Sequence, residues 1–425
     1  MELRIPYGKA YQTLTLPAGV DAELCAPAAS ADPPHEARLV AQAMAAPMGS
    51  PTLETLAQGR RQAVILCSDH TRPVPSKLLI PPLLAALRAG NPQISITLLI
   101  ATGFHRATTH QELVDKFGAD IVARERIVVH DCNDRDSLCQ LGALPSGAPL
   151  VINRLAAQAD LLLAEGFIEP HFFAGFSGGR KSVLPGVCGR ETVLGNHCAG
   201  FIASPHARTG VLEQNPLHRD MCAAARMAKL RYILNVTLDA QKRVCGAVAG
   251  DPQLAHEAGC GLLRQKATLS PSRPGDIVIT SNGGAPLDQN IYQAVKGLTA
   301  AEAAAAPGAV LITCAACADG TGGQDFYRAL RDCQTPAQLL ADIQLVPMER
   351  TAPDQWEVQI LARILSNHRV ILVCEPAVRP LAREMKLDAA ASLEEAYAMS
   401  AAQVSNPRVT VIPDGVSVIV QPPVA

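Results

Sequence analysis

Short apolar runs rich in β-branched residues alternate along the chain with alanine- and leucine-rich stretches of helical length. The runs predict buried strands at 63–67, 94–101, 127–130, 150–152, 161–164, 276–280, 310–313 and 370–373. The stretches between them predict helices at 76–87, where Pro81 and Pro82 favour a later start, and at 111–117, 291–304 and 356–365. This alternation is typical of mostly parallel sheets flanked by helices, so we expect an α/β fold.

A break rich in proline and serine at 269–275 separates two series of strands and helices. It predicts two α/β domains, each with a mostly parallel sheet flanked by helices. The first is expected to cover 1–268, and a second, Rossmann-like domain is expected to cover 272–405. The tail, 406–425, is expected to form two strands around a turn and to belong to the first domain.

Composition and charge exclude several classes of protein. Hydrophobic residues make up 48% and charged residues 18%, which is typical of an ordered globular chain. The net charge of −2 gives no general attraction to nucleic acid or to an anionic membrane. We find no signal peptide and no apolar run of about 20 residues that would span a membrane. The 13 scattered cysteines favour reduced thiols, and therefore a cytoplasmic protein.

Polar clusters follow four of the expected strands at their carboxyl ends. These clusters are Ser68–Pro73, Ala101–Arg106, Glu169–Ser182 and Ser281–Gly284. Ligands of open α/β sheets bind at this edge of the sheet, because the ends of parallel strands meet there. We therefore expect the four clusters to converge on one site.

The longest cluster combines three chemical functions within Glu169–Ser182. His171 can transfer protons near neutral pH, and the Ser-Gly-Gly turn at 177–179 can wrap a phosphate with its backbone N–H groups. Lys181 can bind an anion or form a covalent bond. The segment departs from a nucleoside-triphosphate loop, because Arg180 stands where that motif needs glycine. We favour a phosphate-binding loop with a functional lysine over a plain glycine turn that begins a helix.

His105 follows a strand as His171 does, and Asp69 and Arg72 follow a neighbouring strand. A single histidine is more often a structural hydrogen-bonding group than a catalyst. Two histidines with an acid and a cation at one edge favour proton transfer on an anionic substrate.

Three other positions carry open alternatives. His197 either ligates a metal or occupies a turn, and Lys296, near the start of an expected helix, either binds a carboxylate or is an exposed lysine. Cys314 and Cys317 form a single CxxC without a second ligand pair, so we favour a structural role for them.

Together these segments resemble the nickel-pincer lactate racemases and their relatives, the racemases and epimerases of 2-hydroxy acids. The resemblance runs in order through most of the chain and is carried by Ser68–Pro73, Thr102–Arg106, Glu169–Lys181, His197, Tyr292–Gln293 with Lys296, and Trp356. Gln214 is a departure, because relatives are expected to carry glycine there. The resemblance implies two α/β domains, of which the first binds the cofactor, with the active site in the interdomain cleft.

The resemblance also implies a cofactor and a role for each residue. The cofactor is a nickel-pincer nucleotide, the Ni(II) complex of pyridinium-3,5-bisthiocarboxylic acid mononucleotide, tethered covalently at Lys181. His197 is implied as the nickel ligand, and His105 and His171 as the catalytic acid/base pair. The other implied roles are catalysis by Asp69, substrate binding by Arg72, Lys296, Gln293, Tyr292 and Trp356, and cofactor binding by Thr71, Gly175, Ser177, Gly178 and Gly179.

The implied reaction is racemisation or epimerisation of a small 2-hydroxy acid through a 2-oxo acid. Removing the C2 hydrogen as hydride, while a histidine takes the hydroxyl proton, avoids placing a second negative charge beside the carboxylate. The planar 2-oxo acid can accept hydride on either face, and one histidine serves each orientation of the hydroxyl group. The expected partners are the hydroxy acid and the proteins that synthesise the cofactor. The sequence leaves the particular acid and the oligomeric state open.

Two other functions remain open at this point. An NAD-dependent 2-hydroxyacid dehydrogenase would use similar hydride chemistry, but we find no GxGxxG turn in a suitable context. A non-catalytic binding protein for small phosphorylated anions would use the glycine loop and the basic residues, but it would not need two histidines.

Overall fold

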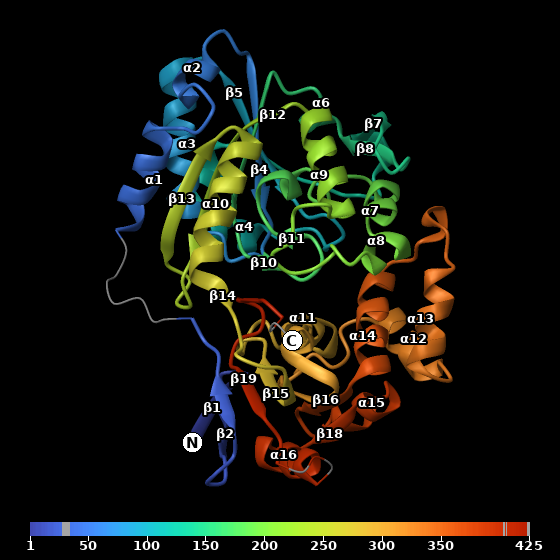
Figure 1. Cartoon of the computed structure of the whole chain (residues 1–425). Coiled ribbons are helices and arrows are strands. Elements are labelled where there is room, and N and C mark those ends of the chain that lie inside the picture. The colour runs from blue at the N-terminus through green and yellow to red at the C-terminus, as the bar shows by residue number, and fades with distance from the viewer. Residues whose placement is uncertain (28–34, 403, 405, 423–425) are drawn as a thin grey trace.

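Two six-stranded sheets, each flanked by helices, form the upper and lower halves of the molecule in Figure 1. The structure is a computed structural model that describes residues 1–27, 35–402, 404 and 406–422. Neighbouring strands run parallel throughout the lower sheet, and in the upper sheet all pairs except β12–β13 are parallel. The α/β class expected from the alternating pattern is therefore confirmed.

The upper sheet has the order β13-β12-β9-β4-β5-β6. Its strands are β4 (Gln62–Ser68), β5 (Ser95–Ala101), β6 (Arg126–Val129), β9 (Leu161–Phe167), β12 (Leu230–Leu238) and β13 (Val244–Gly250). All seven residues of β9 are buried. Helices cover both faces of a parallel sheet, so its strands are continuous apolar runs in the sequence. The sequence pattern located these strands for that reason.

The helices of the upper half are α1 (Glu36–Ala45), α2 (Leu53–Ala57), α3 (Ser76–Gly90), α4 (His110–Phe117), α5 (Ala119–Arg124), α6 (Arg154–Ala157), α7 (Arg190–Asn196), α8 (Ala199–Ala203), α9 (Pro216–Met227) and α10 (Pro252–Ala267). Helix α3 begins at Ser76, so Pro81 and Pro82 lie inside it and not at its start. The two missing backbone N–H donors are tolerated because the helix buries a broad apolar face, formed by Leu79, Ile80, Leu83, Leu84 and Leu87.

The lower sheet has the order β18-β17-β16-β15-β19-β3. Its strands are β15 (Gly275–Ser281), β16 (Ala305–Cys314), β17 (Arg369–Val373), β18 (Asp388–Ala390), β19 (Val409–Ile412) and β3 (Ala22–Leu24). Its helices are α11 (Ile291–Ala304), α12 (Gln324–Asp332), α13 (Pro336–Gln344), α14 (Gln355–Asn367), α15 (Arg379–Glu384) and α16 (Leu393–Ala401).

Both ends of the chain belong to the lower sheet, whereas the sequence pattern placed them with the first domain. Strand β19 pairs with β15, and β3 pairs with β19. The hairpin of β1 (Glu2–Tyr7) and β2 (Ala10–Thr15) packs Leu3, Ile5 and Leu14 against the lower core. The two expected tail strands are present as β19 and β20 (Ile419–Val420), and β20 pairs in parallel with β14 (Thr268–Leu269).

A second correction concerns the expected strand at 150–152. It forms β8 (Pro149–Asn153), which pairs with β7 (Leu138–Ala143) in a separate antiparallel ribbon and not with the upper sheet. Its apolar residues Leu150 and Ile152 are fully buried. In the sequence, such a run therefore resembles a strand of the main sheet.

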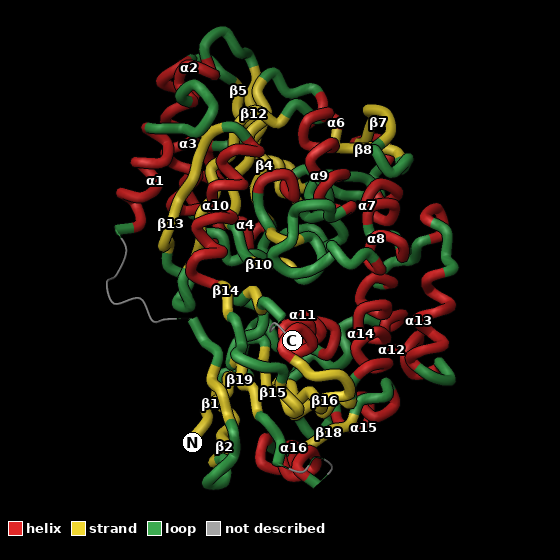
Figure 2. The backbone as a smooth tube through the Cα atoms, in the orientation of Figure 1, coloured by secondary structure: helices red, strands yellow, loops and turns green. Residues whose placement is uncertain are grey.

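The carboxyl ends of β4, β5 and β9 face the lower half. Beyond β9, the short hairpin of β10 (Pro170–His171) and β11 (Gly175–Phe176) lies opposite α11, and loops fill most of this region in Figure 2. Gln359 of α14 donates to the carbonyl of Ala199 in α8 at 2.9 Å, which ties the two halves together. No helix in the described part of the chain is long and apolar enough to cross a membrane.

Candidate active site

Asp69 and His105 form a hydrogen-bonded pair at the ends of β4 and β5. Asp69 is 1% exposed, and its Oδ2 lies 2.5 Å from His105 Nδ1. Its Oδ1 accepts from the amide and the hydroxyl of Thr71, at 3.1 and 2.7 Å. Burial alone would raise the pKa of Asp69, but the hydrogen bonds and charge of its neighbours, His105 first, lower it to about 2. The carboxylate thus fixes Nδ1 of His105 as the donor and leaves Nε2 to exchange protons.

Replacing Asp69 with asparagine should cost up to about 2 kcal/mol of folding free energy at neutral pH. Because the folded pKa lies below the ordinary value of 3.8, this stabilisation is present above that pH. It is lost as the pH falls towards about 2. Urea unfolding of both proteins as a function of pH measures it, with Asp115→Asn as an exposed control. A stability difference that stays constant as the solution is acidified would show that Asp69 is not a charged partner of His105.

His171 and Lys181 face each other across the loop that follows β9. His171 Nδ1 accepts from the amide of Ala174 at 3.3 Å, so the proton of the neutral ring lies on Nε2. That Nε2 is 3.3 Å from Lys181 Nζ. Burial, then the neighbouring cation of Lys181, holds the pKa of His171 well below its ordinary value. Burial, Arg180 and Arg72, in that order, do the same for the pKa of Lys181. The contact therefore joins a neutral imidazole to an amine that is readily deprotonated and nucleophilic.

His197 ends α7 and is 5% exposed. Its Nδ1 lies 2.9 Å from the carbonyl of Val193, which can only accept, so Nδ1 carries the proton and Nε2 keeps a free lone pair. Burial, then Lys181, lowers its pKa to about 3. A neutral histidine held through its other nitrogen by a carbonyl is the usual form of a metal ligand. Within the described ranges, no three His, Cys, Asp or Glu side chains gather to hold a metal ion. Any metal at His197 would therefore need further ligands from a bound group.

A line of aromatic rings connects these histidines to the lower half. The ring centroid of Phe173 lies 4.5 Å from that of His171 and 5.2 Å from that of His197. Trp356 of α14 continues the line, 4.9 Å from His197 and 6.3 Å from Phe104. Trp356 is 8% exposed. The site therefore lies between the two halves, as the sequence analysis expected, and has apolar walls beside its polar groups.

Lys296 and Arg72 bring two basic side chains to the same region, near Glu169. Lys296 of α11 places Nζ 6.0 Å from the ring centroid of Phe172, which itself stacks on His171. Burial, then Arg72, lowers the pKa of Lys296. Burial raises the pKa of Glu169, although Arg72 and Lys296 oppose the rise. A cleft of this charge favours a small anion.

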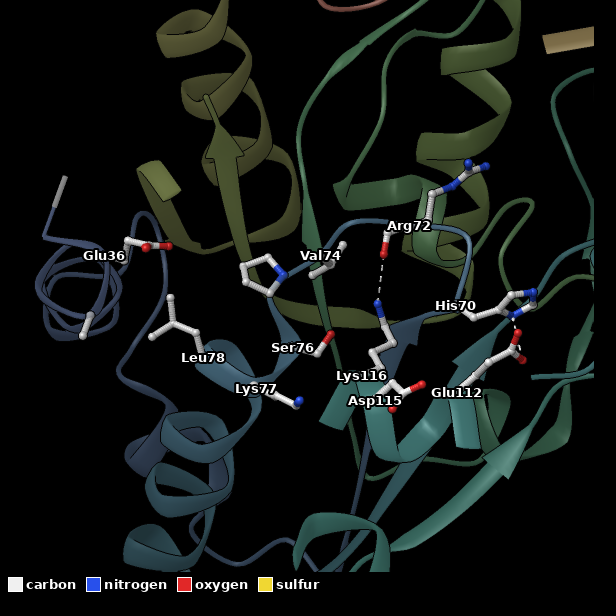
Figure 3. Close-up of a pocket in the computed structure, with 12 residues that line it drawn as sticks. Glu36, His70, Arg72, Val74, Ser76, Lys77, Leu78, Glu112, Asp115 and Lys116 are labelled. Carbon is white, nitrogen blue, oxygen red and sulfur yellow. Dashed lines mark hydrogen bonds and ion pairs between the residues drawn. The ribbon is translucent and has the colours of Figure 1, made fainter. Parts of the chain in front are cut away.

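A cavity of about 720 Å³ lies beside the Arg72 segment, lined by α1, α3 and α4. Figure 3 shows Lys116 bonded to the Arg72 carbonyl, at 3.2 Å, while the Arg72 side chain points away from Lys116. Across the cavity, His70 Nδ1 lies 3.8 Å from Glu112. The Lys116 contact fixes the backbone carbonyl of Arg72, whose side chain is exposed.

Two of the expected substrate-binding residues make other contacts in the structure. The ring of Tyr292 packs against Phe326 at 5.3 Å. The backbone N–H of Gln293 donates to Asn290 Oδ1 at 2.9 Å, and its backbone carbonyl accepts from Asn282 Nδ2 at 2.6 Å. Substrate binding by these side chains stays a prediction.

The glycine loop has structural reasons for its composition. The Ser177 hydroxyl donates to the carbonyl of Phe167, at 3.1 Å, and the Gly179 amide donates to Asn235 at 2.8 Å. Gly178 and Gly179 have φ angles of 75° and 52°, and a Cβ at either would approach Asn235 or His256 to 2.7 Å. The Gly179 amide and the Ser177 hydroxyl are thus hydrogen-bonded within the protein, and phosphate binding by Gly175, Ser177, Gly178 and Gly179 stays a prediction.

Sequence reasoning gave no role to several residues that line the site. Phe172 and Phe173 were visible as an adjacent aromatic pair, and Glu169 as the first polar residue after a strand. Glu357 gave no signal, because a glutamate early in a helix is usually solvated. In the structure Glu357 is 1% exposed, and both of its carboxyl oxygens lack a hydrogen-bond partner among the described residues. Burial raises the pKa of Glu357 to about 8, although the charge of Lys296 opposes the rise.

Comparisons with known proteins show the family to which the chain belongs. A family profile described as the lactate racemase N-terminal domain matches residues 7–210, and one described as the lactate racemase C-terminal domain matches 270–420. The chain is 49% identical over 422 residues, 99% of both proteins, to a lactate racemase of Thermoanaerobacterium thermosaccharolyticum. It is also 49% identical over 387 residues, 91% of both proteins, to a lactate racemase of Lactiplantibacillus plantarum.

Solved structures give the same result. The lactate racemase apoprotein from T. thermosaccharolyticum superposes with a TM-score of 0.96 at 48% identity, covering 99% of this chain and 100% of that one. A protein from Thermotoga maritima, 18% identical with a TM-score of 0.63, shares the fold over 87% of this chain and 96% of its own. The chain therefore belongs to the lactate racemase family and is a racemase, an enzyme of the isomerase class.

Proposed function

We propose that this racemase inverts lactate or a closely related 2-hydroxy acid with the help of a nickel-pincer nucleotide. The observation that carries the proposal is the contact between Lys181 Nζ and His171 Nε2, at 3.3 Å. The ring of Phe173 packs against both His171 and His197 and so connects this contact to His197. A nucleophilic amine, a proton-transfer group and a metal-ligating imidazole rarely meet in a purely structural setting.

Lys181 and His197 fit the two attachments that such a cofactor needs. The Lys181 amine is buried among cations that favour its neutral form, which is the form that can become acylated. The free Nε2 of His197 can complete a coordination sphere whose other ligands, soft sulfur and carbon, belong to the cofactor. When bound, the cofactor supplies the acceptor for the C2 hydrogen of the substrate.

The protein residues bind the substrate and move its hydroxyl proton. Arg72 and Lys296 hold the carboxylate, because they are cations that face a partly apolar cleft. His105, oriented by Asp69, takes or returns the proton at Nε2, and His171, beside the Lys181 amine, serves the opposite orientation of the hydroxyl group. Trp356 and the phenylalanine rings exclude water from the site. They also hold back the 2-oxo acid intermediate, which would otherwise be released to solvent.

The proposal is tested with a panel of enantiopure 2-hydroxy acids and the nickel-loaded enzyme. We expect chiral chromatography to show conversion of either lactate enantiomer to an equal mixture, with slower turnover of acids that carry larger side chains. Accumulation of a 2-oxo acid together with reduced nicotinamide would instead identify a dehydrogenase. Tight binding without inversion of any acid on the panel would identify a binding protein.

A further inference from the structure

Arg180 is an internal cation whose acceptors are carbonyls and imidazoles instead of a carboxylate. The side chain is 3% exposed. Burial lowers the pKa of Arg180 only to about 10, so the guanidinium keeps its charge at neutral pH. Removing a charge from water costs free energy, so the groups that contact the buried guanidinium must replace the hydrogen bonds that water would make with it.

Most of these groups belong to the segment 174–178, which joins His171 to Lys181. Nη2 donates to the carbonyl of Ala174 at 2.8 Å, and Nη1 donates to the carbonyl of Phe176 at 2.8 Å. The carbonyls of Ser177 and Gly178 lie at 3.4 and 3.3 Å from Nη1. One side chain thus gathers four carbonyls of a short segment whose strand pairing is limited to the two residues of β11.

The remaining donors bind this turn to two helices. Nε donates to His218 of α9 at 3.0 Å, and Nη1 donates to His256 Nε2 of α10 at 2.9 Å. Because a guanidinium can only donate, Nδ1 of His218 is an acceptor and His218 is neutral. His256 Nε2 is also 2.9 Å from the Ser177 carbonyl, so it accepts from Arg180 when the ring proton is on Nδ1 and donates to Ser177 when the ring proton is on Nε2. Burial, then Arg180, lowers the pKa of both histidines.

We propose that Arg180 is a positioning residue, which holds the segment 174–178 against α9 and α10 and thereby places the Lys181 amine beside His171. Its value for the reaction depends on the proposed function, but its effect on the loop does not. Lysine cannot take this role, because an ammonium group lacks the planar, forked set of donors that spans Ala174, His218 and His256. Since the positive charge of Arg180 is not balanced by a carboxylate there, it also disfavours protonation of the Lys181 amine.

The test uses the full-length chain without cofactor and the variants Arg180→Lys and Arg180→Met. Arg208→Lys is the matched control, because Arg208 is also partly buried and donates to two backbone carbonyls, those of Ser204 and Ala207. Hydrogen exchange followed by mass spectrometry reports on peptides that cover 174–182. Competitive acetylation with acetic anhydride across a pH series reports on the Lys181 amine.

We expect amide exchange in 174–182 to rise by about tenfold or more in both Arg180 variants, as the loss of charged hydrogen bonds predicts. Exchange elsewhere should stay unchanged, and the acetylation midpoint of Lys181 should move to higher pH in Arg180→Met. The control should show neither change. If Arg180→Met does not fold, the exchange data of Arg180→Lys decide.

Unchanged loop exchange with an unchanged acetylation profile would overturn the proposal, as would a uniform loss of protection across the whole chain. Neither readout needs the cofactor or turnover. A failure of the proposed function would therefore leave these results intact, and the two outcomes can be distinguished.

Discussion

Replacing Lys181 with alanine will leave the chain folded but without an attached cofactor and without racemase activity. The amine lies in a preformed, partly buried position beside His171, and a methyl group there cannot form a covalent bond. Protein produced together with the cofactor-synthesis proteins should therefore show the mass of the bare chain and no stoichiometric nickel. Intact-mass spectrometry and metal analysis measure both quantities on one sample.

The control for this variant is Lys9→Ala, which removes an exposed lysine in the turn between β1 and β2. It should retain the adduct, the nickel and full turnover. A Lys181→Ala protein that still carried a covalent adduct of the same mass, or that racemised lactate at the wild-type rate, would remove Lys181 from the account.

Replacing His105 or His171 with alanine is expected to lower kcat/KM for racemisation by about 10²- to 10⁴-fold in each variant. Each imidazole transfers the hydroxyl proton for one orientation of the substrate, and inversion needs both orientations. Because the enantiomers of lactate have equal free energies, kcat/KM must fall equally in both directions. Chiral chromatography of reactions started from either enantiomer measures the effect, with the exposed His110→Ala as the control.

The cofactor should remain attached in His105→Ala, since this side chain contacts Asp69 and Thr71 and not Lys181. His171→Ala removes the neighbour of the Lys181 amine, so its adduct must be confirmed by intact mass before turnover is interpreted. Wild-type turnover in both variants would contradict acid/base roles for these histidines.

The sequence located the central strands of both sheets, because continuous apolar runs bounded by polar clusters have few alternatives in an α/β fold. It failed at the ends of the chain, where β3 and β19 pair with strands that are distant in sequence. Short apolar runs do not encode their partners, and the partner of β3 lies almost 400 positions away along the chain. The ribbon strand β8 was misassigned to the main fold for a related reason, since burial alone does not reveal which sheet a strand joins.

The candidate site could be predicted in outline because its residues lie at strand ends, where topology brings them together. The pairing of Asp69 with His105 follows from the adjacency of β4 and β5. The contacts of Arg180 with His218 and His256 were not predictable, because they join a loop to two helices that the sequence pattern did not locate. The burial of Glu357 was hidden for a similar reason, as it depends on how α14 packs between the halves.

The most direct test of the account is to racemise lactate that carries deuterium at C2, in ordinary water, with the nickel-loaded enzyme. Chiral chromatography with mass detection follows inversion and isotope content together. We predict that the newly formed enantiomer retains most of its deuterium, because the hydrogen stays within the closed site between removal and return. Complete exchange of the deuterium with solvent during inversion, or the absence of inversion, would contradict the account.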